Sequence, residues 1–187
     1  MRTALLALVM LIVLGPVGCS TAPDTAADRN ELVATSKAKL KLLESTNKNL
    51  YKLYDGSSIA VAVFPKIGKG GLIVGGAYGK GVVFDGKGKA LGYCDVSQGT
   101  LGAQIGGQAY TQFIFIKDER SLQDLKDNAM ELSAQVSAVA AKSDANKTAN
   151  YDNGVAVIVM DAKGLMAEAT VAGQKFRYIP AETYGTE

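Results

Sequence analysis

The middle of the chain is a succession of short runs rich in β-branched and aromatic residues, separated by a few turn residues each. We predict a strand for every run, because this composition between turn residues is typical of strands. The runs are SIAVAVF (58–64), GLIVGGAYG (71–79), GVVF (81–84), KALGYCDV (89–96), TLGAQIG (100–106) and AYTQFIFI (109–116). Connections this short cannot hold a crossover helix, so neighbouring strands must pair antiparallel. The chain is therefore expected to fold around an antiparallel sheet.

Glycine is frequent in these runs, with 21 Gly against 4 Pro in the whole chain. Glycine inside a strand usually marks a bulge, a bend or a close backbone approach. Four of them lie close together: Gly75, Gly76, Gly79 and Gly81. This clustering predicts a strongly coiled sheet that forms a partial barrel. Asp85-Gly86, between two runs, predicts a hairpin turn.

Helical patterns precede the sheet. Asp28 and Glu31 have the spacing of a capping box, which predicts a helix from near Arg29 to Glu44. Ser45-Thr46-Asn47 interrupts it, and a second short helix is expected over residues 48–54. The apolar face of the first helix is modest, so the helix could lie on a membrane or pack against the sheet.

A further helix and a closing meander follow the sheet. Apolar residues recur at three- and four-residue steps through Val139, which predicts one long helix from Ser121 to about Ala141. After a polar loop, three more strands are predicted: VAVIVM (155–160), LMAEATV (165–171) and KFRYIP (175–180). The fold class is thus α+β, a coiled antiparallel sheet with N-terminal helices and one long helix packed on it.

The N-terminus has the pattern of a secretory signal. Arg2 is followed by 11 apolar residues, Ala4 to Leu14, a run too short to cross a bilayer comfortably as a helix. Cys19 follows a small-residue exit and resembles the lipidated cysteine of a bacterial lipoprotein, although Pro16 stands where Leu is usual. The alternative is ordinary secretion with Cys19 simply nearby.

These features predict how the chain is divided and where it works. We expect a signal peptide over 1–18, a lipidated tether over 19–27 and a single domain over 28–187. Ser20 after the lipidated cysteine fits sorting to the outer membrane, with the domain facing the periplasm. Acyl chains on the cysteine, such as palmitate, would make the attachment effectively permanent.

Composition excludes several kinds of catalytic site. The chain has no His, so a Ser-His-Asp or Cys-His site and a His metal ligand are impossible. If Cys19 carries lipid, Cys94 is the one remaining thiol, and we expect it to be a small buried apolar residue. Residues 81–87 have the spacing of a phosphate-binding loop, but Gly88 stands where a Ser or Thr would hold magnesium. A nucleotide site is therefore not expected there. We therefore expect no catalytic residue, no metal, no cofactor and no enzyme activity.

Charge is unevenly distributed along the chain. Residues 28–90 hold eleven Lys and Arg against five Asp and Glu, whereas residues 91–187 hold eight against twelve. The basic half could meet anionic lipid head groups, or it could be an ordinary solvated surface. The candidate head-group contacts are Lys66, Lys69 and Lys80, placed in loops between strands, and then Lys37, Lys39 and Lys41. Nucleic acid is not expected as a partner, because the export signal removes the chain from it.

Three stretches resemble the SYLF-domain family, which includes bacterial lipoproteins and eukaryotic lipid- and actin-binding proteins. They are IAVAVFPKIGKGGLIVGGAYGKGVVF (59–84), VSQGTLGAQIGGQAYTQFIFI (96–116) and VIVMDAKGLMAEATVAGQKFRYIP (157–180). The resemblance implies phospholipid binding. It also includes actin binding in yeast relatives, which is not expected in a cell-envelope compartment.

The sequence thus predicts a non-enzymatic lipoprotein that is anchored to the outer membrane and contacts an anionic phospholipid membrane. The alternative is a structural envelope protein whose sheet edge docks a protein or a glycan. Which lipid or partner is bound, and whether the protein assembles with itself, are not determined by the sequence.

Overall fold

The computed structural model describes residues 21–71, 74–101, 108–132, 151–161, 164–165, 171 and 173–184. The helices are α1 (Ala26–Thr46), α2 (Lys48–Ser57) and α3 (Glu119–Lys126), with a 3-10 turn η1 (Ala181–Tyr184) near the C-terminus. The strands are β1 (Ala60–Gly71), β2 (Val74–Asp85), β3 (Ala90–Leu101), β4 (Gln108–Ile116), β5 (Val155–Asp161), β6 (Gly164–Leu165) and β7 (Lys175–Pro180). Cys19 and the predicted signal peptide over 1–18 lie outside the described residues.

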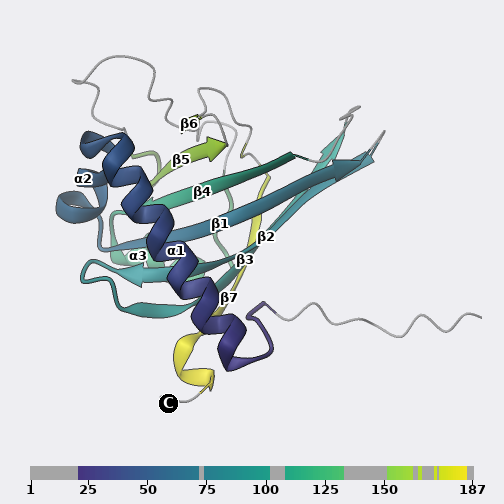
Figure 1. Cartoon of the computed structure of the whole chain (residues 1–187), viewed down its shortest axis with the longest axis horizontal. Coiled ribbons are helices and arrows are strands. Elements are labelled where there is room, and N and C mark those ends of the chain that lie inside the picture. The colour runs from purple at the N-terminus through teal and green to yellow at the C-terminus, as the bar shows by residue number, and fades with distance from the viewer. Residues whose placement is uncertain are drawn as a thin grey trace, which may run out of the picture.

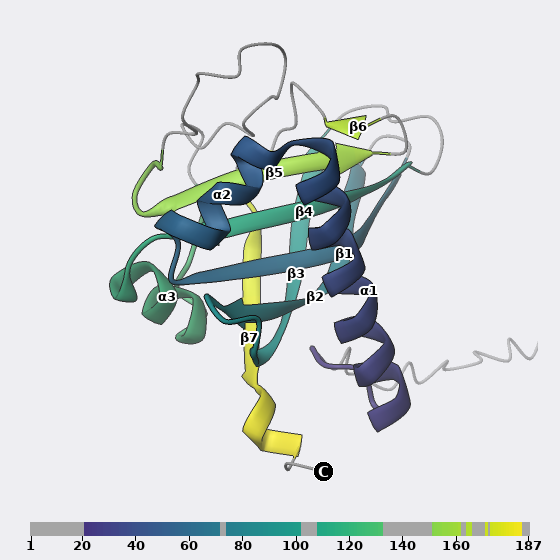
Figure 2. The same ribbon diagram turned by 60° about the vertical axis from the view of Figure 1, so that its left-hand side comes forward.

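All the described strands join one sheet in the order β6-β5-β4-β1-β2-β3-β7, and each neighbouring pair is antiparallel. The predicted α+β class and antiparallel pairing are confirmed. In the described part of the chain the two edge strands do not pair, so the sheet stays open. Figure 2 shows β7 running across the direction of β5, which is the strong twist that the clustered glycines predict.

The sheet separates two apolar cores. On one face, Leu40, Leu43 and Leu50 of α1 and α2 pack over strand residues such as Val63 and Val82; we call this the α1 face. On the other face, Leu122 and Leu125 of α3 pack over residues such as Phe64, Ile67 and Cys94; we call this the α3 face. In Figure 1, α1 crosses in front of the sheet while α3 lies behind it. The central strands are therefore buried on both sides over much of their length.

A bulge in β1 divides the sheet. The pairing register with β2 shifts between Val63 and Lys66, and the register with β4 shifts at the same place. Pro65 lies inside this interval, where a residue without a backbone N–H is tolerated. Opposite the bulge the strands approach closely, because a Cβ at Gly81 would collide with the backbone oxygen of Val63 and the ring of Phe64. This close approach explains a glycine at Gly81.

The first helix begins earlier than predicted. Thr25, and not Asp28, is its N-cap: the Thr25 hydroxyl accepts a hydrogen bond from the backbone N–H of Asp28 at 3.1 Å. The helix starts at Ala26, inside the segment expected to be a tether. Ala22 of the same segment is fully buried, so the part of this segment that the structure describes packs on the domain.

The predicted long helix from Ser121 to Ala141 is wrong in the described residues, because α3 ends at Lys126. Asn128 takes a left-handed φ of 59° and its side-chain oxygen accepts a hydrogen bond from the backbone N–H of Tyr178 at 2.6 Å. The chain then runs beside β7, with Glu131 bridged to Lys175. A tertiary contact thus overrides the helical periodicity, and residues 133–141 lie outside the described residues.

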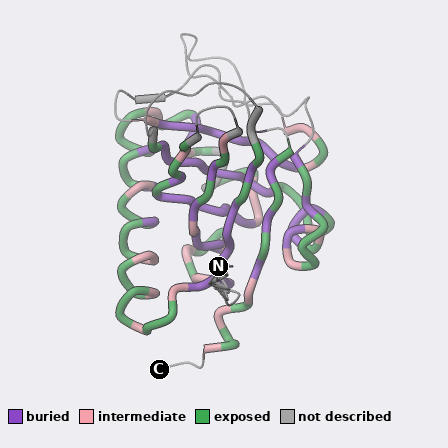
Figure 3. Tube along the Cα trace, turned by 90° about the vertical axis from the view of Figure 1, so that its right-hand side faces the viewer, coloured by how far each residue is buried: buried purple, intermediate pink, exposed green. Residues whose placement is uncertain are grey.

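The first helix lies on the sheet. Its own residues Ser36, Leu40 and Leu43 are buried, and Figure 3 shows the outward side of the helix exposed along its length. Of the two placements that the sequence left open, on a membrane or against the sheet, the structure has the second. Within the described ranges, no helix is both long enough and apolar enough to span a bilayer.

Candidate functional site

Beyond the bulge, the α1 face of the sheet is not covered by helix α1, and three rows of residues lie in register there. The first row is Lys66, Lys80, Asp95 and Arg177, on β1, β2, β3 and β7. The second is Gly68, Tyr78, Ser97 and Lys175, extended by Glu131, and the third is Gly70, Gly76 and Gly99. Residues directly opposite each other share a face of the sheet. We call this surface the open face.

Two like charges lie side by side in the first row. Lys66 is exposed and Lys80 is half-buried, and they are direct cross-strand partners. The ammonium of Lys80 donates a hydrogen bond to the backbone oxygen of Ala22 at 3.1 Å. Like charges directly opposite each other destabilise a sheet, although Asp95, the cross-strand neighbour of Lys80 on its other side, offsets part of this repulsion. An anion that contacts both ammonium groups would remove the repulsion.

Lys69 does not join this pair. It lies three residues after Lys66 on the same strand, and side chains alternate between faces, so it points to the α3 face. There its ammonium lies 4.8 Å from the ring centroid of Tyr110, and burial lowers the pKa of Lys69. The prediction that Lys66, Lys69 and Lys80 lie together in loops is wrong: all three are in strands, and only two share a face.

The three helix lysines lie on α1, above the covered part of the sheet. Lys37 and Lys41 are exposed and Lys39 is half-buried. The ammonium of Lys37 lies 5.9 Å from the ring centroid of Phe84. These lysines are on helix α1 and not on the strands that carry Lys66 and Lys80. Their contact with lipid head groups remains a prediction.

The flat part of the open face consists of glycine. Gly68, Gly70 and Gly99 are exposed, and a Cβ at any of them would meet no atom within 4 Å. Their φ values are not positive. Packing and backbone conformation therefore do not require glycine at these positions, in contrast to Gly81. Tyr78, 42% exposed, is the large apolar side chain of this surface.

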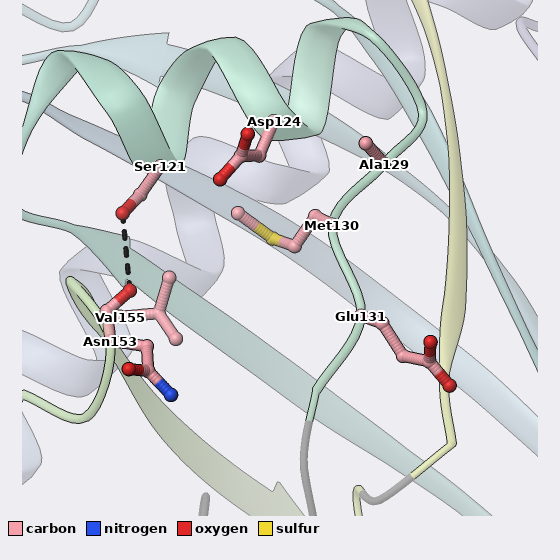
Figure 4. Close-up of a pocket in the computed structure, with 7 residues that line it drawn as sticks. All are labelled: Ser121, Asp124, Ala129, Met130, Glu131, Asn153 and Val155. Carbon is pink, nitrogen blue, oxygen red and sulfur yellow. Dashed lines mark hydrogen bonds between the residues drawn. The ribbon is translucent and has the colours of Figure 1, made fainter.

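A pocket of about 180 Å³ lies between α3 and β5, on one side of residues 129–131. Figure 4 shows Ser121, Asp124 and Glu131 among its lining residues. The Ser121 hydroxyl donates to Asp118 at 2.9 Å and lies 3.2 Å from the backbone oxygen of Asn153. These bonds hold the start of α3 against the turn before β5. The serine is thus engaged in structural hydrogen bonds, with the Asp118 carboxylate as one acceptor.

A second pocket of about 350 Å³ lies on the open face, on the other side of the same segment. Its charged lining residues come from three segments of the chain: Asp95 on β3, Lys175 and Arg177 on β7, and Glu131 in the segment beside β7. Ser97, Asn128, Ala129, Met130 and Phe176 complete it. We call this pocket the β7 groove. None of these residues was predicted as a site from the sequence.

The remaining polar and reactive groups of the interior have structural roles. Cys94 is fully buried, as expected, and burial raises the pKa of its thiol, which keeps it protonated. Gln112 and Gln174 exchange side-chain hydrogen bonds at 2.7 and 3.1 Å within the core. Among the described residues, no group of three or more acidic or thiol side chains could hold a metal ion.

Comparison with known proteins identifies part of this fold. Residues 97–181 match the family model of the Las17-binding protein actin regulator, Ysc84. This segment contains the end of β3 and all of β4, α3, β5, β6 and β7. The chain is also 32% identical over 98 residues to the beta cell expansion factor A of Aeromonas veronii. That alignment covers 52% of this chain and 38% of the relative, so the chain matches little more than a third of the relative's length.

Proposed function

Because the chain carries a SYLF-family domain that includes residues 97–181, we propose that it is a non-enzymatic protein that binds anionic phospholipid. In this proposal Cys19 is lipidated and anchors the protein to the outer membrane, and the domain faces the periplasm. The open face of the sheet then contacts the surface of the bilayer.

The observation that carries the proposal is the cross-strand pair of Lys66 and Lys80 on an exposed sheet face. Each basic residue near an anionic membrane surface contributes about 1 kcal/mol of binding free energy. Arg177 and Lys175, both exposed, lie on the same face, but Asp95 and Glu131 lie directly beside them, so the net positive charge of the face is at Lys66 and Lys80. Lys69, on the other face, is left out of the contact.

The flat glycine rows and Tyr78 support a planar partner. Without side chains at Gly68, Gly70 and Gly99, a planar surface can approach the backbone closely. Tyrosine is favoured at membrane interfaces because its ring is apolar and its hydroxyl is polar. The charge of the lysine pair and the shape of the surface around it therefore favour the same partner.

Vesicle co-sedimentation tests the proposal. A chain that begins at Ser20 lacks the apolar leader and the lipidated thiol, so its binding reports the domain. We expect it to sediment with phosphatidylglycerol vesicles and not with phosphatidylcholine vesicles at low salt, and binding should decline as salt rises. Lys66→Glu should weaken this binding about tenfold or more, since it removes one favourable charge and adds an unfavourable one.

Lys87→Glu is the matched control, because it makes the same charge change in the exposed turn at the opposite end of the β2–β3 hairpin. Equal losses in the two variants would mean that net charge alone matters and that the open face is not the contact. Equal binding to both vesicle types would contradict the lipid proposal and favour a protein or glycan partner. Palmitate labelling that is lost in Cys19→Ser tests the anchor separately.

A further inference from the structure

The β7 groove contains a carboxylate that lies between two basic residues and faces the groove. Asp95 is 6% exposed and lies in register between Lys80 and Arg177. In the ranges that the structure describes, its carboxylate makes no hydrogen bond and no salt bridge, although it lines the groove. The Asp95 oxygens are not among the buried side-chain atoms that lack both a partner and solvent contact, so the carboxylate faces the space of the groove. A carboxylate in this position is available to a ligand that enters the groove.

The cations of the groove are also available to a ligand. Lys175 and Arg177 are exposed, and neither forms a salt bridge with the acidic residue directly beside it, Glu131 or Asp95, within the described part of the chain. The groove therefore presents two positive and two negative side chains that have not neutralised each other. Its net charge is zero, which favours neither a simple anion nor a simple cation.

The frame of the groove is rigid. Asn128 is held by the backbone N–H of Tyr178 at 2.6 Å, and the bridge between Glu131 and Lys175 ties the segment to β7. Phe176, between the two cations, packs into the α3-face core with its ring centroid 5.9 Å from that of Phe64. The volume of about 350 Å³ is in the range of small-molecule sites. The backbone that carries the charged side chains is thus held in place around a space large enough for a small ligand.

From these observations we propose that the β7 groove binds a small zwitterion that carries an ammonium group beside a phosphate. The Asp95 carboxylate accepts hydrogen bonds from the ammonium, and the guanidinium of Arg177 donates to the phosphate, with Lys175 adding charge. Adjacent strands are about 4.8 Å apart, and the two charges of a phosphoethanolamine group are separated by a similarly short chain of atoms. The proposal does not depend on the lipid function, since the same group occurs in free phosphoethanolamine and in a phospholipid head group.

The test uses the full chain in a maltoside detergent and follows backbone amide chemical shifts during titration. O-phosphoethanolamine should shift the amides of residues 95–97, 129–131 and 175–177. Ethanolamine and inorganic phosphate, which each carry one of the two charges, should bind about tenfold more weakly or worse. Phosphocholine should also bind weakly, because its trimethylated nitrogen has no N–H to donate to Asp95. Equal binding of inorganic phosphate and O-phosphoethanolamine, or no shift with either, overturns the proposal.

Two variants assign the roles of the residues. Asp95→Asn and Arg177→Gln should each weaken O-phosphoethanolamine binding roughly tenfold or more, whereas Arg120→Gln, an exposed change on α3, should not. Because the Asp95 carboxylate makes no hydrogen bond or salt bridge in the described part of the chain, Asp95→Asn should leave thermal stability nearly unchanged. Unchanged binding in Asp95→Asn overturns the proposal. If both variants lose stability together with binding, the groove has only a structural role and the proposal is overturned as well.

Vesicles distinguish the source of the ligand. If the ligand is a lipid head group, adding phosphatidylethanolamine to phosphatidylcholine vesicles should increase binding, and Asp95→Asn should abolish the increase. If free phosphoethanolamine binds but this increase is absent, the ligand is a soluble molecule and the proposed site stands. A preference for phosphatidylglycerol that depends on Lys66 is a separate result, so the two proposals can fail independently.

Discussion

The two ends of strand β1 differ although they belong to one continuous strand. Before the bulge, Ala60 to Phe64 are fully buried, because helices cover the α1 face and the α3 core covers the other. After the bulge, Ile67 is buried while Lys66, Gly68 and Gly70 are exposed. The first end, which we call the covered half, supplies the core, and the second, the open half, leaves one face bare. The same pattern of pairing therefore builds a core in one half and leaves an exposed surface in the other.

The composition of each half follows from its environment. The covered half uses residues such as Val61 and Phe64 that gain free energy from burial on two sides. The open half places glycine and lysine on the bare face, and these contribute little to folding. If the comparison is correct, substitutions in the covered half change stability strongly, and substitutions in the open half change ligand binding instead.

The largest expected effect is in the covered half. Phe64→Ala should lower the free energy of unfolding by about 3–5 kcal/mol, because it leaves a cavity beside Phe176 in a fully buried site. Urea denaturation of the two proteins measures the difference. Tyr78→Ala, a change of similar size at an exposed position of the open half, is the control and should cost much less. Comparable losses in both variants would show that the two halves are not energetically distinct.

A smaller effect is expected at alkaline pH from Tyr178, whose side chain is also in the buried core. Burial above all, and then the negative charge of Glu182, raise the pKa of Tyr178 to about 12. Its pKa in the unfolded chain is about 10, so its contribution to stability is complete below that pH and is lost as pH rises toward 12. Tyr178→Phe should therefore flatten the decline of stability in this window.

At neutral pH the same variant should cost about 1 kcal/mol, because it removes the hydrogen bond from the hydroxyl to the backbone oxygen of Leu91 at 2.8 Å. Urea unfolding at several pH values measures both effects. Burial also raises the pKa of Tyr110 to about 12. Part of the alkaline decline in stability should therefore remain in Tyr178→Phe. A decline identical in slope to that of the unchanged protein would contradict the assignment to Tyr178.

The smallest effect on stability is expected in the open half, and with the opposite sign. Gly68→Thr should raise the free energy of unfolding by about 0.5 kcal/mol, since Cβ meets no atom there and Thr favours strands more than Gly does. The same variant should weaken vesicle binding if a planar surface approaches the backbone. Gly81→Thr is the contrasting change and should destabilise, because Cβ collides with Val63 and Phe64. A loss of stability in Gly68→Thr would mean that the fold itself requires this glycine.

Sequence patterns predicted the local elements well where local forces dominate. The strands over 109–116, 155–160 and 175–180 are found within a residue or two as β4, β5 and β7. Residues 74–79 and 81–84 of the two predicted runs belong to one strand, β2, because its pairing with β3 continues without a break from Gly79 to Val82. Gly71 is the last residue of β1. The predicted strand over 165–171 is described at Leu165 in β6, and residues 166–170 lie outside the described residues.

The predictions failed where tertiary contacts decide. The loop expected around Lys66 and Lys69 is part of β1, since both β2 and β4 supply hydrogen-bonding partners on either side of it. The helix expected to continue to Ala141 stops because Asn128 bonds to β7, a strand about fifty residues further along the chain. The β7 groove was missed for the same reason: Asp95 and Arg177 meet only because the last strand pairs with β3.

The amino-acid sequence by itself determined the class of the fold, the antiparallel pairing and the family resemblance, because short connections and periodicity are local properties. It also determined that no histidine chemistry is possible. Only the tertiary structure decided that α1 packs on the sheet, that Lys66 and Lys80 share a face without Lys69, and that a buried carboxylate lies beside Arg177. Those facts depend on the register between strands far apart in sequence, and a shift of one residue would move every side chain to the opposite face.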